Sequence, residues 1–358
     1  MRTENKSIPS ITEWLSGINY KQIKRFRHED ATKRDRLELL NKVIGLPYLK
    51  AIKLNPQDIT KPNALVKKLL IESKNQKFYF KLLPIDPSLA KLRIRDKNIT
   101  ECINWFKKQK IDPKQYKIEI IPIDKNEKMS TVFCCNSREI WGEIIEGPIW
   151  NFSRGTHKKQ PTIFSYNYKT WAFSKKNTRA EQFIKQVIKK IKIKNNQQLQ
   201  LLKKQIKIEV APQNYLQGYF ECIQRGENIL FVDFNRRLFK ILKKALTTVS
   251  NGINLLHGVC LGPGKARGNA VIINEKKVPF TQGSILVCKT ASFSLLPYIK
   301  KSVGIVTEQG AILSHAAIIC RELKKPYVAH VKNATQKIKN GQKIFIDADK
   351  GIIKIIKK

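Results

Sequence analysis

The chain has 358 residues, and 69 Lys and Arg against 28 Asp and Glu give it a formal net charge of +41. Its 42% hydrophobic content is enough to bury real cores, which excludes a disordered or fibrous chain, and its length predicts two or three domains. No apolar run reaches the roughly 18 to 20 residues of a membrane helix, so we expect neither a membrane partner nor a signal peptide. The seven cysteines form no C-x-x-C pair, which favours buried thiols in a reducing cytoplasm over disulfides or a zinc site.

The positive charge is spread evenly along the chain. Residues 252–358 hold 18 Lys and Arg against 5 Asp and Glu, which is nearly the same net charge per residue as in the rest of the chain. A surface dedicated to nucleic acid concentrates its charge, so the even spread favours a general compositional bias. A positive field that recruits an anion such as ATP is the second interpretation. Nucleic-acid binding is the third, and we do not expect it despite the charge.

Apolar residues at helical spacing predict three helices before residue 252. These helices are Thr32 to about Ile44, a block that starts near Arg179, and a third that follows Asn235 and ends at Asn251-Gly252. Thr32 and Asp35 have the spacing of a capping box at the start of the first helix. Strand-like runs lie between the helices, at Lys77–Leu83, Lys117–Ile123, Thr131–Cys135, Tyr219–Ile223 and Ile229–Phe234. The last two flank Arg225-Gly226-Glu227-Asn228, which we interpret as a hairpin turn.

The pattern changes after Gly252. Short β-rich runs then alternate with glycine turns, at Ala270–Ile273, Ser284–Cys288, Val303–Val306, Lys343–Ile346 and Ile352–Ile356. One marked helix is predicted over Ser314–Leu323. We place a domain boundary at 251–258.

A buried strand, a polar glycine turn and a helix follow one another from Gly304 to Leu323. Ser314 occupies the predicted N-cap and His315 the first turn of the helix. Unpaired N–H groups and the positive end of the peptide dipoles gather there, so an anion such as a phosphoryl group on an imidazole would be held. A neutral imidazole is also nucleophilic near pH 7. The alternative is a histidine that only caps or packs against the helix.

A series of further motifs extends over about 100 residues around this histidine. In chain order they are Gly262-Pro263-Gly264-Lys265-Ala266-Arg267-Gly268, Gly283-Ser284-Ile285-Leu286-Val287, Thr307-Glu308-Gln309-Gly310, Ser314-His315-Ala316-Ala317-Ile318, Arg321-Glu322-Leu323, Pro326, Gly341-Gln342 and Asp347 to Gly351. The series resembles the phosphohistidine (swivelling, or mobile) domain of the phosphoenolpyruvate-utilising enzymes, such as pyruvate phosphate dikinase and phosphoenolpyruvate synthase. The resemblance implies that His315 accepts a phosphoryl group, with Ser314 and Thr307 in the same catalytic set. Gly310-Ala311 departs from the pattern, which usually has two glycines.

The hairpin around Gly226 carries a candidate metal site. Glu221 lies on its first strand, and Asp233 and Asn235 lie on its second. Three side-chain oxygens placed in this way can face Mg²⁺ bound to ATP phosphates. The pattern resembles the terminal hairpin of the ATP-grasp fold, with an aspartate where a glutamate is usual.

Two segments upstream resemble the nucleotide domain of pyruvate phosphate dikinase-like proteins. Gly142-Glu143-Ile144-Ile145-Glu146-Gly147 is similar to a G-E-x-x-x-G segment of that domain, and Lys81, Arg93 and Arg95 stand in the place of its phosphate-contacting region. The resemblance implies a cofactor-binding set of Lys81, Arg93, Arg95 and Glu143. The serines usual in that region are missing. We expect Trp141, Trp150 and Trp171 to be core residues.

The sequence therefore predicts a mixed α/β (α+β) chain with an ATP-grasp-like domain and a C-terminal swivelling β/β/α phosphohistidine domain. The expected parts are a helical segment at 1–60, the nucleotide-binding domain at 61–250, a linker at 251–258 and the phosphohistidine domain at 259–358.

The resemblance implies a phosphotransferase that moves a phosphoryl group from ATP, with Mg²⁺, through His315 to an acceptor. Only seven residues follow Gly351, so we expect no phosphoenolpyruvate/pyruvate barrel. The acceptor would then be another small molecule or a separate acceptor-domain protein. The alternative is a catalytically decayed binding or regulatory module, which the missing serines favour.

Overall fold

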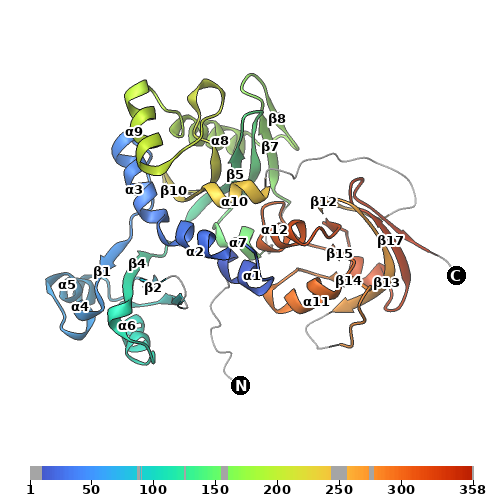
Figure 1. Ribbon diagram of the computed structural model, residues 1–358, viewed down its shortest axis with the longest axis horizontal. Helices are drawn as coiled ribbons and strands as arrows, with labels where there is room; N and C mark the ends of the chain where they lie inside the picture. Colours follow the sequence, from blue (N-terminus) through green and yellow to red (C-terminus); the bar gives the residue numbers. More distant parts are fainter. Residues whose placement is uncertain are drawn as a thin grey trace.

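The computed structural model describes residues 10–86, 89, 91–124, 126–154, 160–242, 256–273 and 278–356. Its described strands form three sheets flanked by helices, which confirms the mixed α/β class (Figure 1). No helix in these ranges has both the length and the apolar character needed to cross a membrane. Most of the predicted linker (residues 251–255) and residues 243–250 of the third predicted helix lie outside the described residues.

The largest antiparallel sheet is covered by apolar side chains on both faces. Its strand order is β10 (Asn228–Asn235), β9 (Gly218–Arg225), β5 (Glu127–Cys135), β6 (Ile140–Glu146), β7 (Thr162–Tyr166) and β8 (Trp171–Phe173). Successive residues of a strand point to opposite faces. Phe133 and Cys135 of β5 therefore belong to one core, and Val132 and Cys134 belong to another. The helices in the Phe133 core are α3 (Lys33–Ile44), α8 (Thr178–Lys190) and α9 (Asn196–Ile206).

The three helices predicted in this half are present, and the hairpin pairs as expected, with Arg225 opposite Asn228. The predicted capping box at Thr32 is wrong. The Thr32 hydroxyl donates instead to the His28 carbonyl, 2.8 Å away, because helix α2 (Ile23–Ala31) leads almost directly into α3. The third helix is described as α10, over Arg236–Leu242.

A smaller antiparallel sheet lies beside the large one, at the lower left of Figure 1. Its strand order is β1 (Ile52–Leu54), β4 (Tyr116–Pro122), β2 (Phe78–Pro84) and β3 (Leu92–Lys97). Three helices cover it and share a core with its strands: α4 (Pro56–Thr60), α5 (Ala64–Glu72) and α6 (Ile99–Lys107). β5 of the large sheet is the next strand after β4 in the chain, so the two sheets are adjacent in sequence.

The C-terminal unit is built on a mixed sheet. Its strand order is β11 (Leu256–His257), β18 (Ile352–Ile355), β17 (Lys343–Asp347), β13 (Lys265–Ile273), β14 (Ile285–Cys288), β15 (Gly304–Thr307), β16 (Tyr327–Ala329) and β12 (Val259–Gly262). The four strands from β13 to β16 run parallel to one another. Its helices are α11 (Leu296–Lys301), α12 (His315–Glu322) and α13 (Ala334–Lys337). In Figure 1, α11 and α12 face the rest of the molecule, whereas β13 and β17 lie on the outer side.

One hydrophobic core joins the C-terminal unit to the first half of the chain. It combines Trp14 of α1 (Ile11–Gly17) and Trp141 of β6 with Leu296 of α11 and Ile318 of α12. Figure 1 shows α1 and α2 lying between the small sheet and the C-terminal unit. Burying apolar surface from both parts stabilises their contact, so the structure represents a docked arrangement.

Candidate functional site

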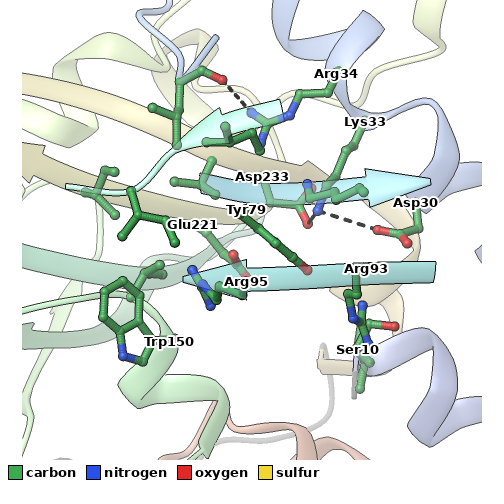
Figure 2. A pocket seen from close by; sticks show the side chains of 18 of the residues that line it. Ser10, Asp30, Lys33, Arg34, Tyr79, Arg93, Arg95, Trp150, Glu221 and Asp233 are labelled. Atoms are coloured by element: carbon green, nitrogen blue, oxygen red, sulfur yellow. Dashed lines mark hydrogen bonds and ion pairs between the residues drawn. The ribbon is translucent and has the colours of Figure 1, made fainter. Parts of the chain in front are cut away.

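A charged pocket of about 180 Å³ lies where the small sheet, the β9–β10 hairpin, the N-terminal helices and the start of α12 meet (Figure 2). Six of the residues predicted from the sequence line it: Lys81, Arg93, Arg95, Glu221, Asp233 and His315. A neighbouring cavity of about 400 Å³ shares Ser10, Asp30 and Lys91 with the pocket, which gives room for a larger ligand. Seven Lys and Arg against four Asp and Glu line the pocket, so it favours an anion.

His315 is brought to the pocket by the local structure that the sequence predicted. Ser314 is the N-cap of α12, and its hydroxyl accepts a hydrogen bond from the Ala317 N–H at 3.3 Å. The His315 ring is partly buried and lies edge-on to Trp14, with 6.5 Å between ring centroids. The imidazole therefore stands at a helix start and lines a cationic pocket, and the positive end of a helix dipole favours a phosphate group.

Thr307 does not line the pocket. It is fully buried at the end of β15, and its hydroxyl donates to the Gln309 carbonyl at 2.7 Å. The Tyr327 hydroxyl is 3.0 Å from the same oxygen. These bonds fix the turn that leads to α12.

Glu143 lies on β6, outside the pocket, and contacts the loop in front of His315. Its two carboxylate oxygens accept hydrogen bonds from the backbone N–H groups of Ile312 and Leu313, at 2.9 and 3.0 Å. Its side chain is almost completely buried, and burial raises the pKa of Glu143 to about 7 in spite of these bonds and the nearby Arg321 guanidinium. Glu143 therefore ties the histidine loop to the large sheet, whereas the resemblance implied a nucleotide contact.

The two acidic residues of the hairpin face each other across the strands. Glu221 and Asp233 are directly paired in the β9–β10 register, and both line the pocket. Burial and the neighbouring Asp233 charge raise the pKa of Glu221 to about 7. Asn235 is not part of this pair, because its side-chain oxygen accepts hydrogen bonds from the Arg237 and Leu238 N–H groups and caps α10.

The three predicted cations of the small sheet reach the pocket with different partners. Lys81 is buried 3.6 Å from Glu119, and burial together with the nearby Arg34 charge lowers the pKa of Lys81 well below its usual value. Arg93 is paired with Glu13 of α1. The Arg95 guanidinium lies between the rings of Tyr79 and Trp150, 4.8 and 4.7 Å from their centroids. Cation–π contacts with these two rings fix the position of Arg95.

Several pocket residues were missed by the sequence analysis. Asp30 and Lys33 come from α2 and α3, and Lys91 directly precedes β3. Trp150 lines the pocket beside Arg95, so its expected place in the core is wrong. Trp141 is buried in the core as expected.

The carboxylate pair could hold a divalent cation whose remaining coordination positions are filled by a bound ligand. Asp233 is buried, and its Oδ1 has no hydrogen-bond partner. Among the described residues, no group of three or more His, Cys, Asp and Glu side chains forms a ready metal site. Mg²⁺ prefers carboxylate oxygens, phosphate oxygens and water. Glu221 and Asp233 would thus hold the ion together with a phosphate, and the ion would neutralise phosphate charge there.

The comparisons with known proteins match the C-terminal unit. Residues 280–351 match the family model described as PEP-utilising enzyme, mobile domain. This part of the chain is similar to the mobile domain of that family. Its relatives include a probable phosphoenolpyruvate synthase of Staphylothermus marinus, which is 35% identical over 118 residues, 32% of this chain and 14% of the relative. Pyruvate kinase 2 of Synechocystis is 39% identical over 98 residues, 27% of this chain and 17% of the relative. The chain thus spans less than a fifth of these relatives.

The first half of the chain has more distant counterparts. The D-alanine–D-alanine ligase of Helicobacter pylori is 13% identical, and the alignment covers 57% of this chain and 54% of the ligase with a TM-score of 0.32.

Proposed function

We propose that the protein is an ATP-dependent phosphotransferase in which His315 takes a phosphoryl group from a nucleotide bound in the charged pocket. The observation that carries this proposal is that His315, the Glu221/Asp233 pair and the basic residues of the small sheet line one pocket. The mobile-domain match supports the role of His315. Mg²⁺ held by the two carboxylates would supply charge neutralisation for the phosphates.

The residues of the pocket would have different roles in the transfer, according to their chemistry. Lys33 brings positive charge to the part of the pocket near Asp233, and Arg95 adds positive charge to the same pocket, where phosphates would be neutralised. An imidazole nitrogen of His315 would form a P–N bond while the bond from the same phosphorus to its bridging oxygen breaks. The electron pair of the broken bond stays on the departing phosphate oxygen of the nucleotide. The start of α12 would hold the phosphohistidine.

The proposed reaction also needs an acceptor for the phosphoryl group. The chain would pass the phosphoryl group either to a small molecule or to a separate acceptor-domain protein. The competing function is a binding or regulatory module that no longer transfers phosphate. The pairing of Arg93 with Glu13 favours this second function, because it removes one predicted phosphate contact.

The test is incubation of the full chain with Mg²⁺ and ATP labelled at either the β or the γ phosphate. We expect acid-labile label on the wild type, none on His315→Asn, and full label on His28→Asn, since His28 is an exposed histidine outside the pocket. The labelled position that transfers identifies the bond that breaks. Absence of label from both positions would contradict the phosphotransferase and favour the module.

A second prediction concerns the carboxylate pair. Asp233→Asn and Glu221→Gln should each reduce labelling at least about a hundredfold while the melting temperature stays close to that of the wild type, since each change keeps the side-chain shape but removes a charge that would hold the cation. Glu227→Gln, at the exposed turn of the same hairpin, is the matched control and should label normally. Full labelling of both acidic-site variants would refute the assigned metal position.

A further inference from the structure

A side chain of the protein, the Lys33 ammonium, already places a positive charge beside the Glu221/Asp233 pair. Like charges directly opposite each other on neighbouring strands repel, and Glu221 and Asp233 are such a pair. The Lys33 ammonium lies 3.4 Å from Oδ2 of Asp233, on the pocket side of the pair. Burial alone would lower the pKa of Lys33, but the negative charges of Asp233, Asp30 and Glu221 outweigh it, so the pKa of Lys33 is raised. Lys33 therefore stays charged in this position.

Lys33 has a second anion within reach. Its Nζ is 3.5 Å from Oδ1 of Asp30, so the ammonium lies between two aspartates, as Figure 2 shows. Asp30 is fixed from its other side by Lys91 at 3.0 Å and by the Thr12 hydroxyl at 3.3 Å. The ammonium can thus leave Asp233 and remain paired with Asp30, so its displacement does not strand a buried charge.

The charge balance decides what else this part of the pocket can accept. Asp30, Glu221 and Asp233 face Lys33 and Lys91, and Oδ1 of Asp233 has no hydrogen-bond partner. A divalent cation at the carboxylate pair would lie close to the Lys33 ammonium, and the two positive charges would repel. Phosphates that enter with the cation would remove this repulsion, because they supply negative charge to both.

From this geometry we propose that Lys33 is a built-in counter-ion of the Glu221/Asp233 pair that a divalent cation must displace. The metal is then bound weakly by the free protein and tightly only together with a nucleotide. The inference rests on the proposed function in that the cation and the nucleotide share this pocket. It assigns to Lys33 a positioning role that precedes any transfer step.

The test is a titration of the full chain with Mn²⁺ at mildly alkaline pH, without nucleotide, followed by the electron paramagnetic resonance of free Mn²⁺. Lys33→Met should bind Mn²⁺ on the order of tenfold more tightly than the wild type, because the competing charge is gone. Lys33→Arg keeps the charge and should behave as the wild type. Lys91→Met is the matched control, since Lys91 contacts Asp30 but not Asp233, and should change the affinity less than about twofold.

A second titration in the presence of a non-hydrolysable ATP analogue separates this inference from the proposed function. If the wild type binds Mn²⁺ with the analogue, but Lys33→Met binds Mn²⁺ alone no more tightly than the wild type, the counter-ion role is refuted and the nucleotide site stands. If Lys33→Met gains affinity but the analogue never enhances Mn²⁺ binding, the counter-ion role holds and the nucleotide site fails. Absence of Mn²⁺ binding by every form refutes both. Lys33→Gln replaces Lys33→Met if that variant does not fold.

Discussion

Glu143 is the residue that most directly connects the two halves of the site. Its carboxylate accepts hydrogen bonds from the backbone N–H groups of Ile312 and Leu313. Glu143 therefore holds the loop that leads into α12 and His315. Arg321 supports the same loop, because its guanidinium donates to the Ile312 carbonyl at 2.6 Å. A buried acid thus acts on the position of the imidazole without touching the pocket.

The raised pKa of Glu143 predicts a pH dependence of stability. The folded-state pKa of about 7 lies above the ordinary 4.5, so protonation favours the folded, docked state. This contribution is complete below about pH 4.5 and is lost as the pH rises through about 7. Glu143→Gln should therefore show a shallower fall of the melting temperature over this interval, measured by calorimetry.

The control for this prediction is Glu146→Gln, an exposed position at the end of the same strand, which should keep the slope of the wild type. Glu221 also has a pKa of about 7 and contributes to the slope of every variant. The informative quantity is thus the difference between Glu143→Gln and the wild type. Parallel curves for these two proteins would contradict the assigned pKa.

Residue by residue, the sequence located the groups whose neighbours are close in the chain. His315 follows its N-cap directly, and alternation along two paired strands places Glu221 and Asp233 on one side. Lys33 could not be found, because one lysine among 69 Lys and Arg gives no signal and its partner Asp233 is 200 positions away. The role of Glu143 was hidden because its partners are backbone N–H groups, which leave no trace in the sequence.

At the scale of elements, the short helix α1 connects the pocket to the C-terminal unit. Trp14 is 3% exposed and lies edge-on to Phe293, with 5.3 Å between ring centroids, as well as edge-on to His315. Glu13 on the same helix pairs with Arg93 of β3. The helix therefore contacts the small sheet with one side and the C-terminal unit with another.

Truncation of Trp14 should loosen this connection. Trp14→Ala removes a large buried ring and should lower the free energy of unfolding by about 3–5 kcal/mol, measured by denaturant unfolding. Because the lost contacts include Phe293, small-angle scattering should also report a larger radius of gyration under native conditions. Trp171→Ala, on the half-buried outer strand β8, should leave the radius unchanged. An unchanged radius for Trp14→Ala would show that α1 does not hold the C-terminal unit in place.

Helices and strands could be predicted from the sequence where their apolar pattern is long enough to stand out. α8 and α12 repeat their apolar residues over several turns, and the β9–β10 hairpin combines two strands with a clear turn. α1 has only seven residues, which is too short for a helical period to stand out. The order of strands in the small sheet depends on contacts between distant segments, so it could not be derived from local patterns.

At the scale of the molecule, the C-terminal unit is docked with His315 at the charged pocket. The contact contains apolar side chains from α1, the large sheet, α11 and α12, together with the Glu143 bonds. A swivelling step would have to expose this apolar surface, which costs free energy in proportion to its area.

The most direct test of this account is a crystal structure of His315→Asn with Mg²⁺ and a non-hydrolysable ATP analogue. We predict that the phosphates lie between Lys33 and the Glu221/Asp233 pair, with one phosphorus about 3–3.5 Å from the residue 315 side chain, as in-line transfer requires. An analogue bound elsewhere, or with its phosphates directed away from residue 315, would contradict the central claim.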